Sequence, residues 1–176
     1  MAVYFIRQKG TNLIKIGSAK DPTERMKSLQ TGSPHEFELL AVGAGGAREE
    51  HAMHRRFVAD HVRGEWFRMS ADIAVAVALC NPEFARMATL EPRLLDGARA
   101  AGSVELEDGR PFCAAAAWYG YSGHGVKDHV TAFVGWLRKD KSNPDLCGPE
   151  AYDVVYDVLS KILPDCRGCN CVSGWE

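Results

Sequence analysis

Two short apolar runs separated by a tight polar stretch open the chain. Residues 2–8 and 12–17 have the length and composition of β-strands, and Lys9-Gly10-Thr11-Asn12 has the composition of a turn. The first arm carries Tyr4, and the second arm ends in Lys15-Ile16-Gly17. The sequence therefore predicts a fold that begins with an antiparallel hairpin.

The segments after the hairpin alternate between helix-like and strand-like patterns. Asp21 and Pro22 suit the N-cap and first position of a helix that runs to about Gln30. Strand, helix, extended segment and helix then follow at residues 37–42, 47–62, 65–68 and 70–80, and Ser70-Ala71-Asp72 is expected to cap the last helix. This order predicts a small α/β (α+β) domain over residues 1–80, with a sheet of about three strands flanked by helices.

The remaining residues suggest a connector and a second unit. Residues 81–110 are rich in Pro, Arg, Ala and Gly, which favours a connector with a short helical piece. Residues 111–176 hold two helical patterns, at 126–140 and 149–163, and end in a cysteine-containing segment. The prediction is a mainly helical C-terminal unit, smaller than the first.

Charge is unevenly distributed along the chain. Residues 1–70 hold eleven Lys and Arg against eight Asp and Glu, a balance of +3, whereas residues 71–176 hold ten against fifteen, a balance of −5. Such asymmetry favours two units with different partners. A balance of +3 fits either a polyanion-binding face or an ordinary solvated surface.

The N-terminal segment and the hydropathy pattern bear on localisation. The chain does not start with a basic stretch followed by an apolar one, and it has no run of 18 apolar residues. A cytoplasmic protein without a membrane partner is therefore expected. In that compartment, the six cysteines are expected to be thiols or metal ligands rather than disulfides.

Three cysteines near the end of the chain form a compact cluster. Cys166, Cys169 and Cys171 give the pattern C-x-x-C-x-C, which suits a structural Zn²⁺ with a fourth ligand from elsewhere. The candidates for that ligand are Cys113, Cys147, His124 and His129. Free thiols are the alternative interpretation.

A series of short motifs is spread in order over residues 3–68. They are Val3-Tyr4-Phe5, Ile14-Lys15-Ile16-Gly17, Arg25, Leu29-Gln30-Thr31-Gly32, Glu50-x-x-x-His54-x-x-Phe57 and Gly64-Glu65-Trp66-Phe67. Together they resemble a GIY-YIG nuclease domain of the divergent phage and bacterial branch, the T5orf172/MUG113-like domains, whose second motif is commonly Lys-Ile-Gly. The resemblance implies a nuclease that acts on DNA.

The resemblance also implies a divalent metal ion. In this family a single helix glutamate holds one Mg²⁺ or Mn²⁺ together with phosphate oxygens and water, and Glu50 matches that glutamate. Mg²⁺ tolerates few protein ligands because it keeps several of its waters. Glu49 is the neighbouring competitor, but it lies about 100° round the helix, so both carboxylates cannot face one metal equally well.

Two further residues match catalytic positions of the family. Arg25 matches the phosphate-binding arginine, and a guanidinium suits that role because its planar fork reaches two phosphate oxygens. Tyr4 matches the tyrosine of the first motif, whose hydroxyl acts on water either as general base or by positioning it. Without the resemblance, Arg25 is a surface arginine and Tyr4 a core aromatic.

The helix that carries Glu50 contains additional candidates. His54 lies four residues from Glu50 and therefore on the same face, where it either relays a proton, contacts phosphate or is simply packed. Arg48 and Arg55 suit contacts with a nucleic-acid backbone, or else form a solvated charged surface. We expect these residues to line the nucleic-acid-binding side.

The chain departs from the wider GIY-YIG family at two points: Lys15 replaces a tyrosine, and the late asparagine found in many members has no match assigned in this sequence. Lys15 stands where the family's second motif has tyrosine, and its ammonium is expected to serve catalysis and phosphate binding rather than replace a phenol. Two functions therefore follow: a metal-dependent DNA endonuclease, or an inactive module of the same fold that binds nucleic acid or a protein. The acidic C-terminal unit is expected to target or regulate it, with a protein as its partner.

Overall fold

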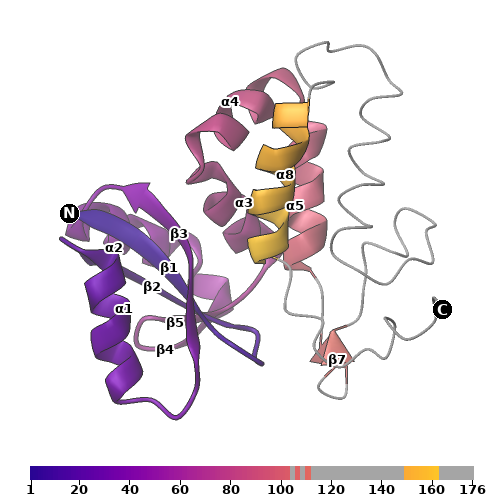
Figure 1. Cartoon of the computed structure of the whole chain (residues 1–176). Helices are drawn as coiled ribbons and strands as arrows, with labels where there is room; N and C mark the ends of the chain where they lie inside the picture. The colour runs from indigo at the N-terminus through magenta and orange to yellow at the C-terminus, as the bar shows by residue number, and fades with distance from the viewer. Residues whose placement is uncertain (104–105, 108–109, 112–148, 163–176) are drawn as a thin grey trace.

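A five-stranded antiparallel sheet forms the centre of the computed structural model, which describes residues 1–103, 106–107, 110–111 and 149–162 (Figure 1). Its strands are β1 (Ala2–Gln8), β2 (Leu13–Ala19), β3 (Phe37–Ala44), β4 (His61–Arg63) and β5 (Trp66–Arg68). They lie in the order β3-β1-β2-β5-β4, and every neighbouring pair is antiparallel. The predicted hairpin and the α/β class are confirmed, but the sheet has five strands instead of about three.

Six helices accompany the sheet in the described part of the chain. They are α1 (Pro22–Thr31), α2 (Ala47–Arg56), α3 (Ala71–Leu79), α4 (Pro82–Leu90), α5 (Arg93–Gly102) and α8 (Pro149–Ile162). A 3₁₀ turn, η1, covers Val58–Asp60, and a separate small ladder joins β6 (Leu106–Glu107) to β7 (Arg110–Pro111). No single helix among these is long and apolar enough to cross a membrane, although α3 and α4, bent by 110° where they meet, pass that test as a pair.

Local sequence explains where the first helices begin. Asp21 accepts hydrogen bonds from the backbone N–H groups of Thr23 and Glu24, both at 3.0 Å, and Pro22 occupies the first turn of α1. The Ser70 hydroxyl accepts from the Ile73 N–H at 3.4 Å and begins α3. Both predicted N-caps are confirmed.

The helix predicted over residues 47–62 is shorter in the structure. α2 ends at Arg56, and Phe57 turns into the core with 1% of its surface exposed. Val58 and Val62, which fitted the apolar side of a longer helix, are 69% and 48% exposed. Val58 lies in the 3₁₀ turn and Val62 in the edge strand β4. The three residues of β4 are too few to give a recognisable sequence pattern.

The stretch predicted as a connector contains two helices. Asn81 caps α4 by accepting from the N–H groups of Glu83 and Phe84, each at 3.0 Å. α5 packs closely on α3, because a Cβ on Gly102 would lie 2.2 Å from the Cβ of Ala74. One short helical piece was expected here. The division of the chain at residues 1–80, 81–110 and 111–176 stays a prediction.

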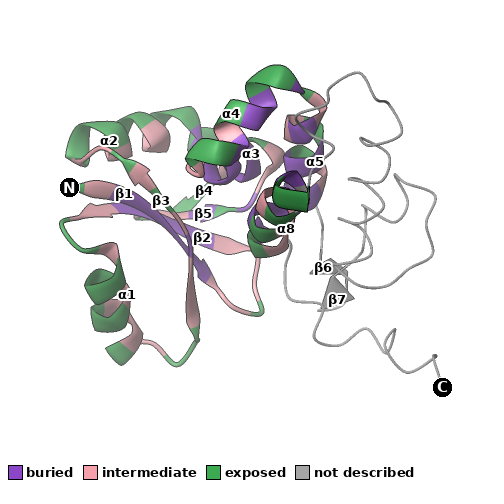
Figure 2. Ribbon diagram, turned by 45° about the horizontal axis from the view of Figure 1, so that its top comes forward, coloured by how far each residue is buried: buried purple, intermediate pink, exposed green. Residues whose placement is uncertain are grey.

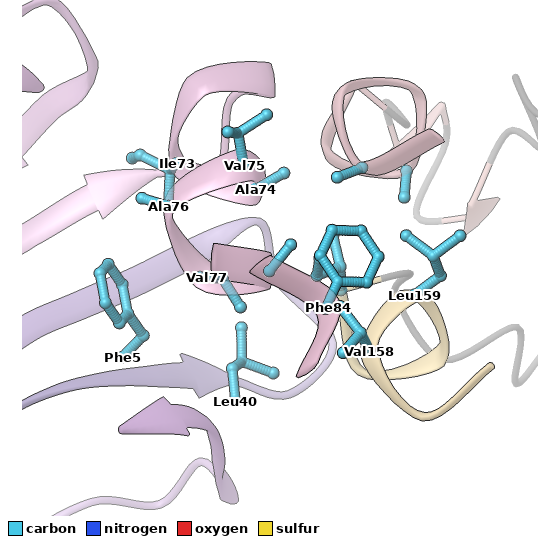
Figure 3. Packing of buried hydrophobic residues seen from close by; sticks show 14 of the residues in the cluster. Phe5, Leu40, Ile73, Ala74, Val75, Ala76, Val77, Phe84, Val158 and Leu159 are labelled. Carbon is cyan, nitrogen blue, oxygen red and sulfur yellow. The ribbon is translucent and has the colours of Figure 1, made fainter. Parts of the chain in front are cut away.

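The hydrophobic core lies between one face of the sheet and the helices α3, α4, α5 and α8. Phe5 and Leu40 from the sheet approach Val77 of α3, while Phe84 packs toward Val158 of α8 (Figure 3). α8 corresponds to the helix predicted at 149–163. The helix predicted at 126–140 lies outside the described residues.

Candidate active site

Tyr4 and Phe5 are neighbours on β1 and therefore point to opposite faces of the sheet. Phe5 joins the core beside α3, whereas the Tyr4 hydroxyl receives a hydrogen bond from Arg25 of α1. Figure 2 shows the same division, with α1 on one side of the sheet and α2, α3 and α4 on the other. Tyr4 and Arg25 thus lie on the face that the main core does not use, whereas Glu50 and His54 come from α2 on the other side of the sheet.

Gly17 creates the space in which the Tyr4 side chain lies. The two residues are directly paired across β1 and β2, and a Cβ on Gly17 would lie 2.4 Å from the Tyr4 hydroxyl oxygen and 2.5 Å from Cζ. Such contacts exclude any larger residue. The close approach at Gly17 is therefore made by the chain's own tyrosine, which lies across β2.

The surroundings of Tyr4 favour its neutral form. Burial of the side chain raises the pKa of the phenol above its usual value of 10.0 and is the largest influence. The hydrogen bond from Arg25 and its positive charge lower that pKa, while the charges of Glu65 and Glu50 raise it. Because burial outweighs the arginine, the Tyr4 hydroxyl keeps its proton at neutral pH.

The two neighbouring glutamates of α2 have different partners. Glu50 Oε2 accepts a hydrogen bond from the Ser18 hydroxyl at 2.6 Å, next to Gly17 on β2. Glu49 instead accepts from the Gly46 N–H at 2.8 Å, and this bond, together with its own backbone N–H, lowers the pKa of its carboxyl. Glu49 is thus used to cap α2, while Glu50 is bonded to β2 at Ser18, the residue after Gly17.

His54 is tied to the end of the strand ladder. The N–H of Ile16 donates to the Glu65 carbonyl at 3.0 Å, and the Ile16 carbonyl accepts from His54 Nε2 at 2.9 Å. β5 pairs with β2 only as far as Lys15, so the imidazole continues the ladder where that strand ends. Its ring also packs against Phe67, with 5.0 Å between centroids. These contacts attach α2 to β2.

Lys15 is buried and paired with Glu65. Only 7% of Lys15 is exposed, and its ammonium forms an ion pair with the Glu65 carboxylate and lies 5.9 Å from the centroid of the Trp66 ring. Trp66 packs on Phe37 at 5.7 Å. Within the described residues, the Lys15 ammonium is therefore already directed at a carboxylate.

The remaining basic candidates of α2 lie on its surface. Arg48 and Arg55 are exposed, which fits both a nucleic-acid-binding role and an ordinary solvated surface. Arg56 stacks on the neighbouring Phe57 ring at 5.2 Å. His61 bonds to the Gly64 carbonyl at 2.9 Å within the β4–β5 connection, and His51 is exposed.

The donor set around Tyr4 suits a metal that takes few protein ligands. Across residues 1–103 and the other described segments, no three or more His, Cys, Asp or Glu side chains gather as a ligand group. Glu50 Oε1 has no hydrogen-bond partner in the same part of the chain and offers one carboxylate oxygen. Such ligation fits Mg²⁺ or Mn²⁺, which retain several waters. Cys166, Cys169 and Cys171, the predicted zinc ligands, lie outside the described residues.

A separate cavity of about 240 Å³ lies away from this face. It is bounded by β3, the junction of α3 and α4, and α8, and its lining includes Val42, Cys80, Asn81, Asp157 and Lys161. None of the candidate catalytic residues borders it. The candidate site is therefore defined by the side chains around Tyr4 and not by this cavity.

Two residues of this site were not singled out as site residues from the sequence. Ser18 supplies the hydrogen bond to Glu50. Glu65 acts on Tyr4 through its charge, which raises the pKa of the phenol. For Ser18, the available clue was a hydroxyl directly after the Lys-Ile-Gly motif; the nearness of Glu65 to Tyr4 depends on the pairing of β2 with β5.

A family model matches the N-terminal part of the chain. Searches of the curated proteins and of the solved structures each found no match. The family model described as T5orf172 domain matches residues 1–81, the stretch from β1 to the end of α3, and this family is associated with nuclease-like domains. Residues 1–81 are thus similar to the T5orf172 domain.

Proposed function

We propose that residues 1–81 form a metal-dependent endonuclease domain of GIY-YIG type that hydrolyses DNA phosphodiester bonds. The observation that carries the proposal is the gathering of the Tyr4 hydroxyl, the Arg25 guanidinium and the Glu50 carboxylate around Gly17. The similarity to a nuclease-associated family supports the reaction class.

Hydrolysis of a phosphodiester joins a water oxygen to phosphorus and breaks one P–O bond, and the departing oxygen takes a proton. Arg25 is exposed and carries a planar fork of donors, so it binds the scissile phosphate while one donor remains on Tyr4. Tyr4 keeps its proton in the free domain, and Arg25 already donates to its oxygen. Its O–H therefore positions water or a phosphate oxygen rather than removing a proton.

Glu50 is the residue that would hold Mg²⁺ or Mn²⁺, through the carboxylate oxygen that Ser18 does not occupy. A bound ion of this kind supplies positive charge to a phosphoryl group and lowers the pKa of a bound water. Ser18 fixes the carboxylate by its hydrogen bond at 2.6 Å. A carboxylate held in one orientation loses less entropy when it binds a metal.

His54 contributes through position in this proposal. Its Nε2–H is bonded to the Ile16 carbonyl, so it holds α2, and with it Glu50, against β2. Arg48 and Arg55 on the same helix extend the contacts to neighbouring phosphates of DNA. The acidic C-terminal part of the chain is proposed to serve targeting or regulation through a protein partner, with Zn²⁺ at its cysteines.

Cleavage of DNA by the full chain tests the proposal. Purified protein is incubated with supercoiled, linear and branched DNA in Mg²⁺, in Mn²⁺ and in a chelator. We expect cleavage only with metal, and we expect Arg25→Ala to reduce its rate at least about 100-fold, because a donor to the transition-state charge is lost. Lys27→Ala removes an exposed cation two residues away on α1 and is the matched control, with little effect expected.

The second candidate is an inactive module that binds nucleic acid or a protein partner. The observation in its favour concerns Lys15, which stands at the position of the family's second catalytic tyrosine. Its ammonium is already paired with the Glu65 carboxylate. Binding of DNA without cleavage of any substrate, in any metal, would establish this alternative and refute the endonuclease.

A further inference from the structure

The Lys15–Glu65 ion pair lies beside the proposed phosphate site, and its lysine is buried while its glutamate is partly exposed. The Lys15 side chain is 9% exposed, whereas the Glu65 side chain is 43% exposed. The ammonium lies between the Glu65 carboxylate and the face of Trp66. A lysine in this position is covered by its partners, and the carboxylate is the member of the pair that solvent or substrate reaches.

Glu65 is held close to Tyr4 by the backbone as well as by its side chain. Its carbonyl accepts from the Ile16 N–H at 3.0 Å, next to Gly17, on which the Tyr4 hydroxyl lies. Its negative charge raises the Tyr4 pKa more than that of Glu50 does. A carboxylate this near the hydroxyl also faces any phosphate that binds to Arg25 and Tyr4, and two like charges repel.

We propose that Lys15 is the internal counter-ion of Glu65, not a phosphate ligand, and that it keeps this face able to accept a DNA phosphodiester. Lys15 is thus a positioning residue: it acts on substrate through Glu65. The inference rests on the proposed function, because it assumes that the phosphate binds beside Tyr4. It assigns Lys15 a different role from the direct phosphate contact expected from the sequence.

The burial of the pair supports this role. A charged group that is nine-tenths buried needs its partner, so the Lys15 ammonium stays with Glu65 unless a substrate replaces that contact. Together the two side chains carry no net charge, and Arg25 remains the exposed cation in contact with Tyr4. The attraction of this face for phosphate therefore comes from Arg25, while Lys15 cancels a repulsion.

Two single variants and their combination separate a counter-ion from a phosphate ligand. The affinity of the full chain for a labelled DNA duplex is measured in chelator, so that cleavage does not interfere. Lys15→Met leaves Glu65 uncompensated and is expected to weaken binding about tenfold. In Lys15→Met/Glu65→Gln the affinity returns to within about threefold of wild type, because the carboxylate charge is gone as well.

The salt dependence of binding gives a second readout. A lysine that contacts phosphate contributes about 0.9 to the slope of log affinity against log salt concentration. For a counter-ion, the slope of the double variant equals that of wild type. Lys161→Met/Asp157→Asn removes a lysine–carboxylate pair of α8, away from Tyr4, and is the matched control, for which no change is expected.

The outcomes distinguish this inference from the proposed function. Suppose that wild type binds the duplex and that a thermal transition shows the double variant to be folded. If the double variant then binds as weakly as Lys15→Met, with a salt slope lower than that of wild type by about 0.9, Lys15 contacts phosphate and the counter-ion role is wrong. If wild type cleaves DNA with metal but Lys15→Met binds as well as wild type, only the counter-ion role is overturned. If wild type shows no salt-dependent binding to the duplex, both the role and the proposed function fall.

Discussion

The two faces of the sheet use the same strands for opposite purposes. On one face, Phe5, Ile14 and Ile16 pack with the helices into a continuous apolar core. On the other, the cross-strand partners Tyr4 and Gly17 lie beside polar and charged side chains. A shift of one residue in register would exchange the core for the site, so the packing of the core face fixes the geometry of the site face.

Adjacent substitutions on β1 test this division and carry the largest expected effect. Phe5→Ala removes a fully buried ring and should lower the free energy of unfolding by about 3–5 kcal/mol. Tyr4→Phe keeps the ring that lies on Gly17 and removes only the hydroxyl, so stability should change far less while metal-dependent cleavage falls. Denaturant unfolding and plasmid cleavage measure the two quantities. Equal losses of stability in both variants would refute the division.

Arg7 is the charged exception on the core face. It is 5% exposed, and its guanidinium donates to the carbonyls of Lys161 and Ile162, the latter at 2.5 Å, at the end of α8. Arg7→Met leaves those carbonyls without this donor and should destabilise the protein by about 1.5–3 kcal/mol. Amide hydrogen exchange should then accelerate in α8 more than in β1. Unchanged protection of α8 would show that its docking does not depend on Arg7.

Burial of the Cys80 thiol at the end of α3 should make the stability of the protein depend on pH. Burial raises the pKa of its thiol to about 11 from a usual 9.0, so the folded protein holds this proton more tightly than the unfolded chain. The resulting stabilisation is complete below pH 9 and is lost as the pH rises to about 11, an effect of about 2 kcal/mol. Urea unfolding between pH 8 and pH 11 should therefore show a steeper loss for wild type than for Cys80→Ala. Parallel curves would contradict the burial of the thiol.

Ser18 should have a smaller effect that is confined to the candidate site. Ser18→Ala removes the hydrogen bond to Glu50 and leaves the strand pairing intact. The concentration of Mn²⁺ that gives half-maximal cleavage should rise roughly fivefold, equivalent to about 1 kcal/mol, with little change in stability. A change in stability without a change in metal dependence would make Ser18 a structural residue only.

The sequence predicted what is determined locally. Asp21 and Ser70 were identified as caps because capping depends on residues two or three positions away. The hairpin followed from two apolar runs and a turn, and α8 from its helical periodicity. Edge strand β4 was missed because its three residues are exposed and carry no alternation of their own.

Contacts between distant residues required the structure. Lys15 and Glu65 are fifty positions apart and meet because β5 pairs with β2. The separate roles of Glu49 and Glu50 depend on how α2 begins, at Gly46, and on which strand it faces. The sequence identified the residue types of the candidate site, whereas the charge balance around Tyr4 is a property of the folded sheet.

The difference between Glu50 and Glu49 is the most direct test of the central claim, that Tyr4, Arg25 and Glu50 form a metal-dependent site. The measurement is the initial rate of Mg²⁺-dependent plasmid cleavage by Glu50→Gln and by Glu49→Gln. Glu50→Gln should lower the rate at least about 100-fold, because it removes the carboxylate proposed to hold the metal. Glu49→Gln affects only the cap of α2 and should stay within about threefold of wild type. Wild-type cleavage by Glu50→Gln, or equal losses in both variants, would contradict the account.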